Sequence, residues 1–514
     1  MAVFDLGTAV PISYEAFLRW SAQGVAAGRG LHLWPTIAFW GLVQVYLGAA
    51  TAALHLDPRA MRLVLLPFLA AIGWGEFLLA RRLGAGRFWA AAVAMLVVCS
   101  PLTLALATGF SSDVPYLGLL MLAVATGLGW VQRGRGGPLT VALVLLALVQ
   151  RQYGLGVLGG VTVGLILARR TRRVAGREWA ILLAGWLLAL GTLALAYPLG
   201  IATPDSRRYA ADLLRPPLTG IAAGVFEVPV MTAFLGLPLL LPLLASRGRR
   251  VGNRQLVAVA LAVYTLLMSA VVFAGFLGPG RARAIFPGDW FTQAGLGPAH
   301  MPGGKPTLFS GTGFLLLQGL TLVTMVLIFA WRADAWTVWR RNLVPAAFLL
   351  VVAASQFPAI YMDAIIDRHF LPVAALALPV VAVALTRSGY RWQRGLPLLR
   401  ASVLVAALLE VVFFAVGEQD QQAWLSASQR AAAVELANFE PLEVDAGPLN
   451  AELIDIPYYA ANGRPPTYPR PVKAFLSFAP PGDARPGFEY RSLAPGKVVI
   501  VCVEKRPRCG ELLR

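Results

Sequence analysis

Asp113 is the first residue whose type and position point to chemistry. It lies in the stretch GFSSDVPYLG, between two long apolar segments. An ionisable group at membrane depth is costly and is therefore a candidate for function. A carboxylate in such a place can accept the proton of a reacting hydroxyl group. A structural alternative stays open, because Asp is also favoured as the N-cap of a helix.

A guanidinium group follows in the stretch QRQYG, which joins two short apolar segments. Arg151 and its neighbour Gln152 lie where bases close to the apolar segments are scarce, so Arg151 requires an anion. A phosphate is the natural partner, because a guanidinium binds it through two parallel hydrogen bonds. The alternative is an interfacial anchor whose charged end reaches water.

A third group lies in YMDAIIDRHFLP, which contains Asp363, Asp367, Arg368 and His369 before a proline-bearing segment. Three titratable residues in succession at the boundary of an apolar segment make this turn a candidate site. The alternative is an Asp–Arg pair that only closes the turn.

Other candidates stand alone in the sequence. Asp5 is the first acid, and the stretch Gly278–Gly311 is long enough for a lid or a binding loop. Glu76, Glu227 and Glu410 lie inside apolar segments, where each is expected to be hydrogen-bonded within a bundle. Glu227 and Glu410 could also line a cavity.

The elements that position these residues are predicted to be membrane-spanning helices. The chain is 58% hydrophobic and 14% charged, whereas soluble domains carry about 25% charged residues. Its apolar segments are continuous rather than alternating, which favours helices over a barrel. They cover about 34–55, 62–80, 88–109, 114–131, 138–150, 155–168, 179–198, 218–245, 255–277, 312–331, 343–362, 370–386 and 400–416. We therefore predict an all-α polytopic membrane helix bundle of about 11–13 transmembrane helices. The segments 138–150 and 155–168 are short, and could be half-length or tilted helices that meet near the outer face.

The arginines predict the orientation of the bundle. Alternate loops are rich in arginine and poor in acids, among them the loops at 81–87, 133–135, 169–177, 247–254, 332–341 and 387–400. The positive-inside rule places these loops in the cytoplasm. The candidate groups at 113, 151 and 363–369 then gather on the extracytoplasmic face. The segment 34–55 either crosses the membrane, with the N-terminus in the cytoplasm, or dips into the outer leaflet, with the N-terminus outside.

Three regions are expected along the chain. Residues 1–33 form an N-terminal outer-face or interfacial segment, residues 34–416 form the bundle, and residues 417–514 form a small soluble extracytoplasmic tail. The tail is predicted to be an α/β region with a helix over 423–439 and a strand over 498–502. Its acids and bases nearly balance, so the net charge of +18 does not indicate nucleic-acid binding. Cys502 and Cys509 could pair in an oxidising compartment or remain thiols.

Several well-known motifs are absent from the sequence. It has no Walker loop, no GxGxxG between a strand and a helix, no HExxH and no CxxC. This disfavours an ATPase, a dinucleotide enzyme and a zinc protease. With four histidines in the chain, a metal such as Mg²⁺ or Mn²⁺ would be held by carboxylates.

The order and sidedness of these stretches resemble the GT-C glycosyltransferases, in particular bacterial members of the protein-mannosyltransferase and aminoarabinose-transferase type. The similar stretches are GRGLHLWPTIAFW with RLVLLPFLAAIGWGEFLLARRLG, VVCSPLTLALATGFSSDVPYLGLLMLA, LALVQRQYGL and DRHFLP. The tail stretch AWLSASQRAAAVELANFEPLEVDAG is also similar to the tail of some bacterial members. The spacing is similar over most of residues 1–416.

The resemblance implies roles for particular residues. Asp5 and Asp113 would be the catalytic acids, each acting as a base or a metal ligand. Arg151, Gln152, Arg368 and His369 would contact the donor phosphate, and Asp363, Asp367 and Glu227 would support them. Asp5 is followed by Leu6 rather than by a second acid, and no apolar span precedes it.

The resemblance also implies a function. The chain would be a multi-pass protein of a bacterial-type inner or plasma membrane. It would transfer a hexose or pentose, with inversion, from a polyprenyl-phosphate donor to an extracytoplasmic glycan, lipid or protein. Two alternatives remain open at this point: a transporter or flippase of lipid-linked or polar substrates, and an inactive GT-C-like binding protein. Transporters usually contain internal repeats, and the sequence shows no such repeat. The missing second acid and missing first span would favour the inactive binder.

Overall fold

The computed structural model describes residues 14–33, 40–56, 58–109, 111–196, 198–199, 228–240, 242, 291–292, 295–296, 311–330, 343–362, 367–387, 396–445, 451–462, 474–478, 488–491 and 497–504. The statements below concern these residues. Asp5, Glu227, Asp363, Cys509 and most of the loop 278–311 lie outside them.

The described chain is a bundle of apolar helices, as the sequence predicts. Five helices are long and apolar enough to cross a membrane, or six if one bent pair counts as a single span, and several shorter apolar helices accompany them. The protein is therefore a polytopic helical membrane protein. The helices of the first half are α1 (Tyr14–Ala26), α2 (Leu42–Ala53), α3 (Pro58–Leu63), α4 (Leu66–Leu83), α5 (Arg87–Cys99), α6 (Pro101–Thr108), α7 (Asp113–Arg133), α8 (Gly137–Gln150), the short 3₁₀ helix η1 (Gln152–Leu155), α9 (Gly156–Ala168) and α10 (Gly176–Ala196).

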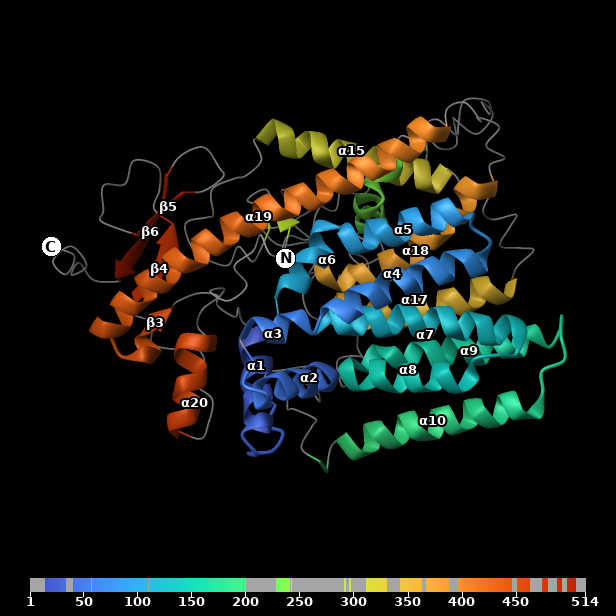
Figure 1. The fold of residues 1–514 in the computed structure, drawn as a ribbon, viewed down its shortest axis with the longest axis horizontal. Helices are drawn as coiled ribbons and strands as arrows, with labels where there is room; N and C mark the ends of the chain where they lie inside the picture. Colours follow the sequence, from blue (N-terminus) through green and yellow to red (C-terminus); the bar gives the residue numbers. More distant parts are fainter. Residues whose placement is uncertain are drawn as a thin grey trace.

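The second half completes the bundle with η2 (Leu237–Leu239), α15 (Gly311–Ala330), α17 (Leu343–Met362), α18 (Asp367–Arg387) and the 43-residue helix α19 (Leu396–Asn438). In Figure 1 most of these helices lie side by side along the long axis of the molecule. Helix α7 is at the centre, with 94% of its most apolar window buried. The side chains that position the site are therefore anchored in the best-packed part of the fold.

The predicted segment 88–109 is not one helix. Helices α5 and α6 are bent by 49° at Ser100, where Pro101 has no N–H group to continue the helix. The Ser100 Oγ accepts a hydrogen bond from the Thr103 N–H and starts the new helix. The sequence showed an unbroken apolar run, so hydropathy alone could not reveal this bend.

Glycines allow helix α9 to pack closely against helix α17. A Cβ atom added at Gly160 would lie 2.8 Å from a Val352 methyl group and 3.0 Å from the Phe348 carbonyl oxygen, and one at Gly156 would overlap the Ser355 side chain. Small residues spaced four apart are the usual means of close helix packing in membranes. This packing sets the position of α17 beside the turn at 151–155.

The C-terminal region is an α/β unit built on the end of α19. Its sheet has the strand order β3 (Val444–Asp445), β4 (Ala474–Phe478), β6 (Lys497–Glu504) and β5 (Phe488–Arg491), with β3 parallel to β4 and the other pairs antiparallel. Trp424 and Leu425 of α19 form its core with Val444, Ile454 and Leu476. The region also contains α20 (Ile456–Asn462), and a two-stranded hairpin of β1 (Phe291–Thr292) and β2 (Gly295–Leu296) lies in the loop 278–311.

Two expectations about the tail can be compared with these elements. The strand expected at 498–502 is present within β6. The helix expected over 423–439 is not separate, because α19 continues through it, so the boundary expected at 416–417 falls inside one helix. Figure 1 places the sheet and α20 at the end of the bundle where α1, α3 and α6 lie.

The C-terminal end of α7 is held by an ion pair between Arg172 and Glu178. Arg172 Nη1 and Nη2 donate to the two Glu178 carboxylate oxygens at 2.8 and 2.7 Å. The same guanidinium donates through Nε to the Val131 carbonyl and through Nη2 to the Trp130 carbonyl, at 2.9 and 3.2 Å. It therefore caps the last turn of α7, where carbonyl groups have no partner within the helix. The hydrogen bonds that Arg172 donates to the Glu178 carboxylate raise the pKa of Arg172 above its ordinary value.

Candidate functional site

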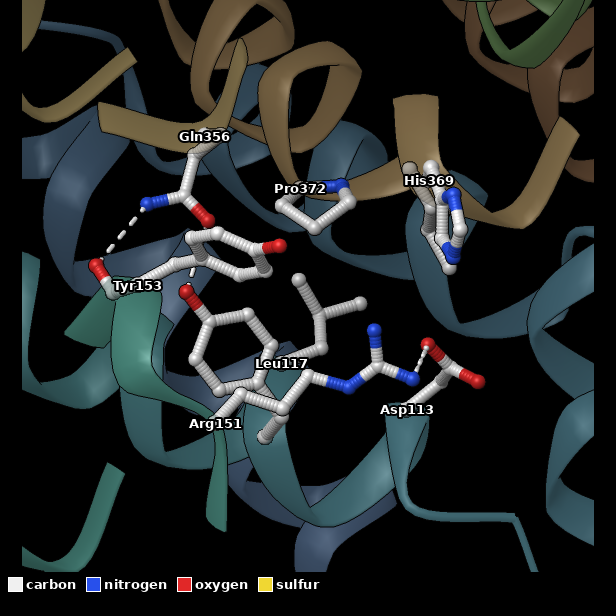
Figure 2. Close-up of a pocket in the computed structure, with 9 residues that line it drawn as sticks. Asp113, Leu117, Arg151, Tyr153, Gln356, His369 and Pro372 are labelled. Atoms are coloured by element: carbon white, nitrogen blue, oxygen red, sulfur yellow. Dashed lines mark hydrogen bonds and ion pairs between the residues drawn. The ribbon is translucent and has the colours of Figure 1, made fainter. Parts of the chain in front are cut away.

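A small pocket lies at the N-terminal end of α7, where α7, η1, α17 and α18 meet (Figure 2). The residues that line it are Asp113, Tyr116, Leu117, Arg151, Tyr153, Gln356, His369, Leu371 and Pro372. Apolar side chains form part of its wall, while the charged groups gather at one side. The structure thus brings three of the residues predicted from sequence, Asp113, Arg151 and His369, to a single pocket.

Asp113 and Arg151 form a buried ion pair in this pocket. Arg151 Nη2 lies 2.7 Å from Asp113 Oδ1, and the two side chains are 7% and 9% exposed. The same nitrogen donates to the Ser112 Oγ at 3.2 Å, and the Ser111 Oγ donates to Asp113 Oδ2 at 2.9 Å. Figure 2 shows the other terminal nitrogen of the guanidinium pointing toward the side of the pocket formed by Pro372 and His369.

This geometry bears on the structural alternatives for the two residues. Ser112 occupies the N-cap position of α7, and Asp113 is the first helical residue. The Asp113 carboxylate is thus held by an arginine and does not serve as the N-cap. Arg151 is 6% exposed, so it is not an anchor that extends into water.

A break between two helices presents Arg151 to the pocket. Helix α8 ends at Gln150, and Arg151 is extended, with φ −149° and ψ 134°, before η1 begins. Gln150 is fully buried, and its Nε2 donates to the Ser112 carbonyl at 3.1 Å. Its Oε1 accepts from the Gln44 N–H at 3.3 Å. Gln150 therefore fixes the start of α7 and the end of α8 relative to each other, which sets the separation of Asp113 from Arg151.

Three polar side chains of the pocket, those of Tyr116, Tyr153 and Gln356, were not predicted. The Tyr116 hydroxyl donates to Gln356 Oε1 at 2.6 Å, and Gln356 Nε2 donates to the Tyr153 carbonyl at 3.3 Å. Gln356 is a polar residue inside the apolar segment 343–362, and that feature could have marked it as a candidate. Tyr116 follows Asp113 by three residues, so both lie on the same face of α7.

His369 is buried, with 5% exposure, in the first turn of α18. Figure 2 shows its ring across the pocket from Arg151 and above Asp113. Asp367 and Arg368 belong to the same turn, but their side chains lie outside the described residues. Gln152 is half-buried in η1 and is not among the residues that line the pocket.

The carboxylate set expected for a metal ion is only partly within the described chain. Asp113 and His369 are the two residues of the pocket that could ligate a metal ion, and Asp113 is already held by Arg151. Among the described residues, no group of three His, Cys, Asp or Glu side chains could hold a metal ion. Asp5, the other expected ligand, lies outside them.

Comparisons with known proteins give one similarity in structure. No protein-family model and no curated protein sequence matches the chain. The fold is similar to a crystal structure of ArnT from Cupriavidus metallidurans bound to undecaprenyl phosphate, with 13% sequence identity and a TM-score of 0.47. The match covers 97% of this chain and 95% of that one. At this identity and TM-score it concerns the course of the chain alone, so the proposal below is based on the pocket.

Proposed function

We propose that this protein is a membrane glycosyltransferase that moves a sugar from a polyprenyl-phosphate donor to an extracytoplasmic acceptor. The observation that carries the proposal is the buried Asp113–Arg151 pair, which opens into a pocket at the end of a membrane bundle. The pair supplies a proton acceptor and an anion-binding group within one hydrogen bond of each other. Both are needed for a hydroxyl group to replace a phosphate at the anomeric carbon of a sugar.

Arg151 is the group we assign to the phosphate of the donor. A guanidinium binds phosphate oxygens in a fixed fork, and the buried setting strengthens that attraction. When the bond between the sugar and the phosphate breaks, the phosphate gains negative charge. Groups already aimed at that charge stabilise the transition state without reorganising. His369, across the pocket, would add a second hydrogen bond to the same oxygens.

Asp113 is the group we assign to the acceptor. While Arg151 holds its carboxylate, Asp113 has one oxygen engaged in the ion pair. A donor phosphate competes for the same guanidinium and leaves the carboxylate available. The acceptor oxygen then forms a bond to the anomeric carbon, the bond to the phosphate oxygen breaks, and Asp113 takes the hydroxyl proton. Direct displacement inverts the anomeric carbon and releases a polyprenyl phosphate.

The arginine-rich end of the bundle supports an extracytoplasmic site. The turns after α4, α7 and α9 lie together at the end of α7 opposite the pocket, since Arg82 contacts Gly129 and Arg172 caps α7. The positive-inside rule assigns that end to the cytoplasm. The pocket and the C-terminal sheet then face the outside, where lipid-linked sugars and cell-envelope acceptors would meet.

The proposal is tested by transfer of labelled sugar from a panel of polyprenyl-phosphate donors, in membranes that carry the wild type or Asp113→Asn. Reactions with and without Mg²⁺ or Mn²⁺ report any metal requirement. We expect label on an acceptor with the wild type only. Label that accumulates in sealed vesicles without a covalent product would identify a transporter. Donor binding without turnover would identify an inactive binder, and either result would contradict the proposal.

A further inference from the structure

Gln356 joins the two elements that carry the ion pair. It lies on α17 with 1% exposure, and its amide accepts from the Tyr116 hydroxyl at 2.6 Å and donates to the Tyr153 carbonyl at 3.3 Å. Tyr116 belongs to α7, the helix of Asp113, and Tyr153 belongs to η1, two residues after Arg151. Gln356 therefore bridges α7 and η1 one helical turn away from the ion pair.

The tyrosine in this bridge lies beneath the guanidinium. Arg151 Cζ is 6.0 Å from the centre of the Tyr116 ring, within the range of a cation–π contact. The Tyr116 ring is buried, and its hydroxyl is held by Gln356. The glutamine thus sets the orientation of the ring against which Arg151 rests.

An amide suits this position because it can accept one hydrogen bond and donate others at the same time. Gln356 Nε2 also donates to the Ser355 Oγ at 2.9 Å. Ser355 is the residue packed against Gly156 of α9. The close packing of α9 against α17 therefore fixes Ser355, which accepts a hydrogen bond from Gln356 on the same helix. The Gln356 amide in turn bonds to α7 and η1.

We propose that Gln356 is a positioning residue that holds Arg151 in place for the donor phosphate through the Tyr116 ring and the Tyr153 backbone. This inference rests on the proposed function of the pocket. When the phosphate takes Arg151 from Asp113, the ion pair no longer joins α7 to η1. Gln356 still joins them, and the guanidinium keeps its direction during the reaction.

The test compares Gln356→Met in the wild-type background and in an Arg151→Lys background. Methionine keeps the length and volume of the side chain and removes its hydrogen bonds to Tyr116, Tyr153 and Ser355. We expect transfer activity, as kcat/KM for the donor, to fall about 10-fold in the wild-type background, because misplaced groups lose rate steeply. In the Arg151→Lys background, where the guanidinium fork is absent, we expect a change of less than about 2-fold. Equal losses in both backgrounds would show a merely structural role and overturn the proposal.

Two further variants complete the design. Tyr116→Phe keeps the ring but removes the hydroxyl bond, and its effect should not add to that of Gln356→Met. Gln318→Met is the matched control, since Gln318 is a buried glutamine of α15 that does not line the pocket. It should leave activity unchanged, and a loss as large as that of Gln356→Met would contradict the inference.

Failure of the proposed function would be visible separately. If the wild type transfers no sugar from any donor, the same variants are titrated with undecaprenyl phosphate. Weaker binding by Gln356→Met than by Gln318→Met would support the positioning role without catalysis. Equal binding by the two variants, or no binding by the wild type, would overturn it.

Discussion

Helix α7 carries an arginine–carboxylate pair at each end, and the two pairs differ in what surrounds them. At the C-terminal end, Arg172 contacts both oxygens of Glu178 and two backbone carbonyls. At the N-terminal end, Arg151 Nη2 contacts the Asp113 carboxylate and the Ser112 hydroxyl, and the side chain lines a pocket. Both pairs hold a helix end, and the second also lines the pocket.

The difference shows how one interaction type can serve two purposes. The Arg172 guanidinium is surrounded by acceptors of its own chain, so a new anion would have to displace several bonds at once. In the proposed function, the Arg151 guanidinium exchanges the Asp113 carboxylate for a phosphate while its Tyr116 contact remains. The Arg172 pair is a helix cap, and we propose that the Arg151 pair exchanges anions.

The largest effect is expected from Asp113→Asn. The amide is nearly the same size as the carboxylate but cannot take the hydroxyl proton, so transfer should fall about 10³-fold. The measurement is the single-turnover rate with a donor that the wild type accepts. A rate within threefold, or about 0.6 kcal/mol, of the wild type would remove Asp113 from the chemistry.

Arg151→Lys should follow, with a loss of about 10²-fold in kcat/KM. Lysine keeps the charge but not the planar fork that matches a phosphate. Steady-state kinetics at varied donor concentration measure the loss, with Arg172→Lys as the control at the other end of the same helix. Equal losses for the two lysine variants would break the distinction between the pairs.

His369→Gln should reduce transfer by about 10-fold, since it removes one of the groups facing the phosphate but leaves the guanidinium. The rate is compared with that of Gln318→Met, which changes a buried polar residue outside the pocket. If His369→Gln keeps wild-type activity, His369 of α18 does not contribute to the site, which would then consist of residues of α7 and η1.

Glu178→Gln should leave the transfer rate within about 2-fold of the wild type, because the Arg172 pair has no role in binding. It should instead lower the free energy of unfolding by about 1–3 kcal/mol, as the guanidinium loses a charged partner. Thermal unfolding in detergent together with the transfer assay separates the two quantities. A strong loss of transfer with unchanged stability would contradict the assignment.

The sequence predicted the fold class and the charged part of the site for the same physical reason. Ionisable residues are rare at membrane depth, so Asp113, Arg151 and His369 stood out, and their predicted common side followed from the arginine-rich loops at the other ends of the segments. Tyr116 and Gln356 did not stand out, because uncharged polar residues interrupt an apolar run only weakly. Their contact joins positions 240 residues apart, and no local spacing reports such a pairing.

Element boundaries were predicted less well where hydropathy and helix formation disagree. Glu418 and Asp420 end the apolar run, so the last span was predicted to stop at 416, yet both are buried within one continuous α19. The reverse occurs at Ser100, where the apolar run continues but Pro101 starts a new helix. Packing decides the first case and backbone chemistry the second.

The most direct test of the account is the affinity for undecaprenyl phosphate of the wild type, Arg151→Met, Arg172→Met and Asp113→Asn in detergent. The account predicts binding at least about 10-fold weaker for Arg151→Met and unchanged for Arg172→Met. It also predicts tighter binding for Asp113→Asn, because the lipid phosphate no longer competes with a carboxylate for the guanidinium. Equal affinity of all four proteins would contradict the claim that the Asp113–Arg151 pair is the phosphate site.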